Sequence, residues 1–129
     1  MKKSRVMIVD DEEDFLKIVK LNLEASGKYE VLTLVSAKNI ISEVHNFTPD
    51  IILLDLLMPM IGGIEVCEML NKDSIGKDTP IIIVSALEKD QDKLKAYKEG
   101  IVDYLTKPIE NSELIARIEK ALAFKRSAS

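Results

Sequence analysis

The chain has 129 residues, 47% of them hydrophobic, and a single cysteine, so it is the size of one domain that can bury a core without an internal disulfide. Its formal net charge of −4 is opposite to the basic face of general nucleic-acid binders, so we expect no direct nucleic-acid contact. No apolar stretch reaches the ~18 to 20 residues of a membrane span, and the lone cysteine fits a reducing cytoplasm, where we expect the protein.

Apolar runs and amphipathic segments alternate along the chain. Runs such as 51–54 and 81–84 are almost wholly Ile, Leu and Val, which is typical of buried strands. Helical spacing, as of Leu16 and Leu23 ahead of Gly27, predicts a helix after each strand. In chain order, the predicted elements are strand 5–9, helix 13–26, strand 30–35, helix 38–46, strand 50–54, helix 64–70, strand 81–84, helix 89–99, strand 102–105 and helix 111–125.

Strands that are apolar on both sides predict a parallel sheet with helices on each face. Right-handed crossovers leave few topologies, and the sequence favours an α/β fold with a single doubly wound, flavodoxin-like sheet of five strands in the order 2-1-3-4-5, with five helices. In that order, ligands bind where the first and third strands adjoin. We expect one domain at residues 1–125 and a tail or the start of a linker at residues 126–129.

Polar residues close four of the predicted strands. Asp10 and Asp11 follow the first strand, Asp55 the third, Ser85 the fourth and Lys107 the fifth. Carboxylates that share one sheet edge repel one another, and Mg²⁺ relieves this repulsion because it prefers oxygen ligands. With an ammonium and a hydroxyl added, the set is suited to holding a phosphoryl group beside the metal. We expect Asp55 to keep an exposed oxygen that can attack phosphorus.

Four short motifs carry these residues: Val9-Asp10-Asp11-Glu12, Asp55-Leu56-Leu57-Met58-Pro59 with Gly63, Val84-Ser85-Ala86, and Tyr104-Leu105-Thr106-Lys107-Pro108. Any one of them is a weak signal, whereas all four in this order at matching separations are specific. Together they resemble the receiver domain of bacterial two-component response regulators, over about residues 5–124.

The resemblance implies a role for each strand-end residue. Asp55 would be the phosphoacceptor, and Mg²⁺ would be held by Asp10, Asp11, Asp55 and the backbone carbonyl of Leu57. Lys107 would pair with the phosphoryl group. On this view the protein is not an enzyme acting on a separate substrate, but a domain that assists its own phosphorylation and dephosphorylation.

The resemblance also implies a switch. Ser85 would bond a phosphoryl oxygen, Tyr104 would turn inward as the switch aromatic, and the Lys107–Pro108 bond would be cis. The surface made by the fourth helix, fifth strand and fifth helix would then change. Expected partners are a sensor histidine kinase or histidine phosphotransfer protein, a downstream protein or linked output domain, and a second copy on phosphorylation, with no membrane partner.

The chain departs from the family pattern at two places. Gly62 stands where family members often have an acid, which loosens the turn before Gly63. Leu57 and Leu87 occupy the positions, two residues after Asp55 and Ser85, that tune loss of the phosphoryl group in the family. Because neither side chain assists an attacking water, we expect a long-lived phosphorylated state.

Three other functions fit parts of the pattern. An aspartyl-nucleophile phosphatase on a similar sheet would need a second acid at Leu57, which transfers no proton. A flavodoxin-type electron carrier would need a phosphate-cradling loop where this chain has acids after the first strand. A pseudo-receiver that only binds proteins is disfavoured by the intact acids and Lys107.

Residues outside the motifs allow weaker interpretations. The helix at 89–99 has few apolar anchors, chiefly Leu94 and Tyr97, so we expect it to be loosely held. We expect the single histidine, His45, to be a solvated surface residue, and Cys67 to be a small buried apolar residue.

Overall fold

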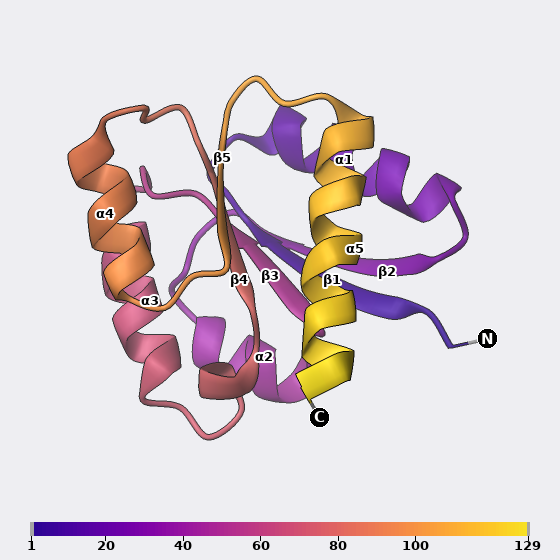
Figure 1. The fold of residues 1–129 in the computed structure, drawn as a ribbon, viewed down its shortest axis with the longest axis horizontal. Coiled ribbons are helices and arrows are strands. Elements are labelled where there is room, and N and C mark those ends of the chain that lie inside the picture. Colours follow the sequence, from indigo (N-terminus) through magenta and orange to yellow (C-terminus); the bar gives the residue numbers. More distant parts are fainter. Residues whose placement is uncertain (1, 129) are drawn as a thin grey trace.

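A computed structural model describes residues 2–128, with side chains as far as residue 125, and shows helices on both faces of one parallel sheet (Figure 1). The strand order β2-β1-β3-β4-β5 and the parallel pairing of all neighbours confirm the predicted topology. The strands are β1 Ser4–Val9, β2 Tyr29–Leu34, β3 Ile51–Leu54, β4 Ile81–Ser85 and β5 Asp103–Thr106. The helices are α1 Glu13–Ala25, α2 Ile40–Phe47, α3 Gly63–Asn71, α4 Asp90–Lys98 and α5 Asn111–Ala128, with a short 3-10 helix, η1 Gly76–Asp78, before β4.

The sheet divides the core into two halves. Because side chains alternate along a strand, Val6 and Ile8 of β1 face the half that α1 and α5 cover, while Met7 and Val9 face the half under α2, α3 and α4. Every residue of β3 and β4 is buried, as expected for strands covered on both sides. Each fully buried Ile or Leu stabilises the fold by roughly 1.5–3 kcal/mol.

The predicted anchors of α4 are wrong. Leu94 and Tyr97 are 57% and 47% exposed, whereas Ala96 is completely buried. Two helix faces were available, and the larger apolar side chains lie on the outer one. The face that packs inward carries Ala96, a residue small enough to let the helix backbone come close to its neighbours. Choosing the packing face of α4 by its largest apolar side chains therefore gave the wrong face.

Two glycines have distinct roles in the fold, of which the sequence predicted the one at Gly27. Gly27 ends α1 with a positive φ of 77°, the left-handed conformation expected there. Gly63 starts α3 so close to the segment after β3 that a Cβ would lie 2.5 Å from the carbonyl oxygen of Asp55. Any side chain at position 63 would therefore push against the backbone that carries Asp55.

The remaining predictions about the chain have mixed outcomes. The Lys107–Pro108 bond is cis, as the resemblance implied. Among the described residues, no helix is long and apolar enough to cross a membrane. Helix α5 continues to Ala128, so most of the segment expected to be a tail is helical, and Ser129 lies outside the described residues. The domain boundary itself stays a prediction.

Candidate functional site

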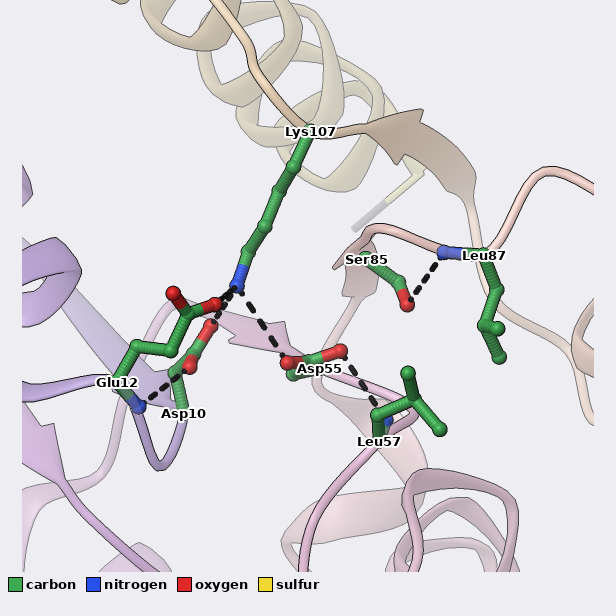
Figure 2. Close-up of polar contacts among 7 residues, drawn as sticks. All are labelled: Asp10, Glu12, Asp55, Leu57, Ser85, Leu87 and Lys107. Carbon is green, nitrogen blue, oxygen red and sulfur yellow. Dashed lines mark hydrogen bonds and ion pairs between the residues drawn. The ribbon is translucent and has the colours of Figure 1, made fainter.

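The ends of four strands meet at one edge of the sheet and bring the predicted site residues together (Figure 2). The pairing of β1 with β3 sets Val9 beside Leu54, so that Asp10 and Asp55 follow at neighbouring positions. Sheet-like hydrogen bonds continue into the site, because the Asp55 N–H donates to the carbonyl of Val9 at 3.0 Å. On the other side, the Lys107 N–H donates to the Ser85 carbonyl at 2.8 Å. The backbone thus fixes the positions from which these side chains extend.

Three carboxylates form the acidic part of the site. Asp10, Asp11 and Asp55 each offer an oxygen, and these oxygens lie within 4.8 Å of one another. Asp10 and Asp55 are buried, while Asp11 is exposed, so the cluster opens to solvent on one side. Burial raises the pKa of Asp10, and the charge of Asp55 adds to this, against hydrogen bonds from Lys107 and the backbone of Glu12. An all-oxygen donor set under this charge repulsion fits a hard divalent cation.

Lys107 extends from the end of β5 into this cluster. Its Nζ lies 2.7 Å from Oδ2 of Asp10, 2.6 Å from Oε1 of Glu12 and 3.4 Å from Oδ2 of Asp55 (Figure 2). It also lies 4.4 Å from the centre of the Phe15 ring. Burial lowers the pKa of Lys107, but the hydrogen bonds to Asp10 and Glu12 outweigh it and raise the pKa overall. The site therefore holds one permanent positive charge.

Asp55 is less exposed than the sequence led us to expect. The residue is 4% exposed, and both oxygens have partners: Oδ1 accepts the N–H of Leu57 at 3.1 Å, and Oδ2 faces Lys107. The cause is tertiary, because Lys107 reaches over the carboxylate from another strand and the chain after β3 folds back onto it. The oxygen that faces Lys107 is the more weakly held of the two.

Ser85 and Tyr104 are linked through the backbone of Leu87. The Ser85 hydroxyl, which is fully buried, accepts the N–H of Leu87 at 3.2 Å. Tyr104 donates its phenol to the carbonyl of Leu87 at 2.8 Å and is only 8% exposed. Burial raises the pKa of Tyr104, so the phenol stays a neutral donor. The ring is thus largely buried, and its role as a switch stays a prediction.

Sequence reasoning missed two contacts of the site. Glu12 was quoted within a motif without a role, yet its carboxylate binds Lys107. Phe15 lies within the predicted helix 13–26 and was given no role in the site, yet its ring contacts the Lys107 ammonium. The acidic run at residues 10–14 was the available signal for Glu12, but five adjacent acids do not reveal which one turns inward. No signal in the sequence marks Phe15.

Comparison with known proteins agrees with this architecture. The sequence model of the response regulator receiver domain matches residues 6–119. The DNA-binding dual master transcriptional regulator RpaA of Synechocystis is 36% identical over 118 residues, which are 92% of this chain and 48% of that protein. The alkaline phosphatase synthesis transcriptional regulatory protein PhoP of Bacillus subtilis is 34% identical, with the same coverage. The chain thus spans about half the length of these two curated relatives.

Solved structures show the same fold. A putative response regulator from Chloroflexus aurantiacus superposes with a TM-score of 0.87 at 30% identity, over 95% of this chain and 99% of that one. A receiver domain protein from Methanospirillum hungatei gives a TM-score of 0.91 over 99% and 100% of the chains, and at 24% identity it supports the fold alone.

The comparisons also bear on the expected partners. The relative from Synechocystis is by name a DNA-binding regulator, so the expectation that the protein makes no nucleic-acid contact finds no support. The family match covers the strand ends that carry Asp10, Asp55, Ser85 and Lys107. With its predicted topology present and its site residues gathered at one sheet edge, the chain belongs to the response regulator receiver domains of two-component signalling.

Proposed function

We propose that Asp55 accepts a phosphoryl group from a phosphohistidine of a sensor histidine kinase or a histidine phosphotransfer protein. The observation that carries this proposal is the convergence of three carboxylate oxygens within 4.8 Å, with the Lys107 ammonium among them. A cluster of that charge is costly to hold together and has no evident structural purpose, since the strands beneath it are already covered on both faces.

The proposed transfer is a direct displacement at phosphorus. An oxygen of Asp55 forms the new P–O bond, the P–N bond to the donor imidazole breaks, and the imidazole nitrogen takes a proton from solvent. Oδ2 of Asp55 is the attacking atom on geometric grounds, because Oδ1 is held by the Leu57 N–H. Lys107 lies 3.4 Å from Oδ2 and would follow the charge as it moves onto the phosphoryl oxygens.

The donor set supports magnesium as the resident cofactor. Asp10, Asp11, Asp55 and the backbone carbonyl of Leu57 would hold Mg²⁺, which would offset the negative charge of the carboxylates and of the incoming phosphoryl group. The domain then supplies position and charge rather than a proton-transfer group. This fits a cytoplasmic signalling role, not turnover of a separate substrate.

The output proposed is a change at the surface of α4, β5 and α5. The Ser85 hydroxyl accepts the Leu87 N–H and also interacts with the Tyr104 side chain, and a phosphoryl oxygen on Asp55 would compete for this hydroxyl. Moving Ser85 would disturb Leu87 and hence the Tyr104 phenol that binds the Leu87 carbonyl. The altered surface would change affinity for a downstream protein, a linked output domain or a second copy.

The test is phosphorylation of purified protein by a labelled phosphohistidine donor, with and without Mg²⁺. Asp55→Asn should take up no label, and wild type should require the metal. Asp78→Asn is the matched control, because Asp78 is exposed in η1, at the opposite end of the strands. Label on Asp55→Asn at the wild-type level would exclude Asp55 as the acceptor.

A further inference from the structure

The Lys107 ammonium is held unevenly within the site. Glu12 and Asp10 contact it at 2.6 and 2.7 Å, whereas Asp55 lies at 3.4 Å. Figure 2 shows Glu12 and Asp10 on one side of Asp55, and Ser85 with Leu87 on the other. The positive charge is thus displaced from the acceptor carboxylate toward the segment that joins β1 to α1.

Two residues of that segment and one residue of α1 form the binding site of the ammonium. Asp10 supplies a buried carboxylate, and its other oxygen accepts the N–H of Glu12 at 2.9 Å. Glu12 therefore acts twice, orienting Asp10 through its backbone and binding Lys107 through its side chain. One turn of chain later, the Phe15 ring receives the same ammonium at 4.4 Å, within the range of a cation–π contact.

The contact from Glu12 is the one suited to exchange. Its side chain is 63% exposed, whereas that of Asp10 is 2% exposed. An ion pair with one solvated partner is worth little, since water competes for the carboxylate. A dianionic phosphoryl group on Asp55 would carry more charge than Glu12, so it can displace Glu12 from Lys107 without a large penalty.

We propose that Glu12 is a positioning residue that holds Lys107 away from Asp55 in the unphosphorylated protein and competes with the phosphoryl group for it. The inference rests on the proposed function, because it concerns the cation expected to pair with phosphoryl oxygens. It adds a residue that restrains the phosphorylated state. Neutralising Glu12 leaves Asp10 as the one carboxylate that draws the ammonium away from Asp55, and so strengthens the binding of a phosphoryl mimic.

The test compares beryllofluoride binding by Glu12→Gln and Glu13→Gln at saturating Mg²⁺. Both variants remove one negative charge from adjacent exposed residues, but of these two residues only Glu12 has a described contact with Lys107. We expect Glu12→Gln to bind beryllofluoride about two- to fivefold more tightly than Glu13→Gln, the range for an exposed ion pair. Equal affinities, or weaker binding by Glu12→Gln, overturn the proposal.

Two further measurements separate positioning from a general charge effect. In a Lys107→Met background, Glu12→Gln should give no gain over Glu13→Gln, because the two positions then no longer interact. If the gain persists there, Glu12 does not act through Lys107. The ¹⁵N signal of the Lys107 ammonium should be equally protected from solvent exchange in wild type and Glu13→Gln, and less protected in Glu12→Gln. An ammonium equally protected in all three proteins contradicts the proposal.

The design also separates this inference from the proposed function. If wild type fails to bind beryllofluoride, or if Asp55→Asn binds it equally well, the phosphoacceptor assignment is wrong. If wild type binds through Asp55 while Glu12→Gln and Glu13→Gln behave alike, only the role of Glu12 is wrong.

Discussion

The start of α3 offers a sharp test of how closely the acceptor segment is packed. A Cβ added at Gly63 would lie 2.5 Å from the carbonyl oxygen of Asp55 and 2.7 Å from the Cα of Leu56. Both are backbone atoms, and a relaxed contact needs ~3.5–4.0 Å. Gly63→Ala must therefore push the segment after β3 outward by about 1 Å, and the Asp55 side chain must move with it.

The expected cost follows from that displacement. Forcing one carbon into a packed site costs roughly 1–3 kcal/mol. For a domain of this size, each kcal/mol lowers the midpoint of thermal unfolding by roughly 3–5 °C, so Gly63→Ala should lose about 3–15 °C. Mg²⁺ should raise the midpoint of wild type by binding the folded state, and the variant should show a smaller rise because Asp55 is displaced.

Gly62→Ala is the matched control. The backbone at Gly62 is extended, with φ −76° and ψ 163°, and a Cβ there meets only the carbonyl oxygen of Leu56 at 3.7 Å. This substitution should leave the midpoint unchanged or raise it. Alanine lowers the conformational entropy of the unfolded chain, which stabilises the folded state by about 0.4–1 kcal/mol. Circular dichroism melts with and without Mg²⁺ measure both effects. Equal midpoints and equal Mg²⁺ responses for the two variants would refute the packing argument.

Two further predictions concern pH and phosphoryl lifetime. The pKa of Asp73 is lowered in the folded protein, first by the hydrogen bond from the Gly76 N–H and then by His45. The charged carboxylate therefore stabilises the fold fully above the unfolded pKa of ~3.9. This stabilisation is lost as the pH falls through the lower folded pKa. The difference in melting midpoint between wild type and Asp73→Asn should be constant from about pH 5.5 to 4.5 and shrink toward pH 3; a difference that grows on acidification contradicts the sign. The apolar side chains of Leu57 and Leu87 cannot assist a water that attacks the acyl phosphate, so timed acid quenching should show a long-lived phosphorylated species. Leu57→Glu should shorten its lifetime. Loss of the phosphoryl group within seconds in wild type would show the reasoning to be wrong.

His45 shows how a surface interpretation can be correct and still incomplete. The residue is half exposed, as expected, but its ring contacts Asp73 at 2.8 Å, and that carboxylate also accepts the N–H groups of Ile75 and Gly76. The histidine thus joins α2 to the loop before β4. Cys67, by contrast, is fully buried as predicted, and burial raises the pKa of its thiol to about 12.

Local pattern determined the fold and the contents of the site. Strands that are apolar on both sides need helices on both faces, and right-handed crossovers then leave one favoured strand order, which the structure has. Parallel strands end at one sheet edge, so acids placed after the first and third strands had to meet there. The role of Gly27 was also predictable from local sequence, because glycine readily adopts the left-handed conformation that ends a helix.

Tertiary packing decided what periodicity leaves open. Helix α4 could present either of two faces, and close packing selected Ala96 over the larger Leu94 and Tyr97. In α5, Leu114 is only 1% exposed, while its neighbour Ile115 is partly buried. A helix turns by the same angle whichever side faces the sheet, so only its neighbours fix the rotation.

The same limit applies to the site. The sequence placed Lys107 near the acids, but the ammonium could have bound any of the carboxylates that follow the first and third strands. Its preference for Asp10 and Glu12 over Asp55, and its contact with Phe15, depend on how far β5 stands from the segment after β1. Residue type and order determine which charges gather at a sheet edge, whereas the distances between strands and helices decide which of those charges touch.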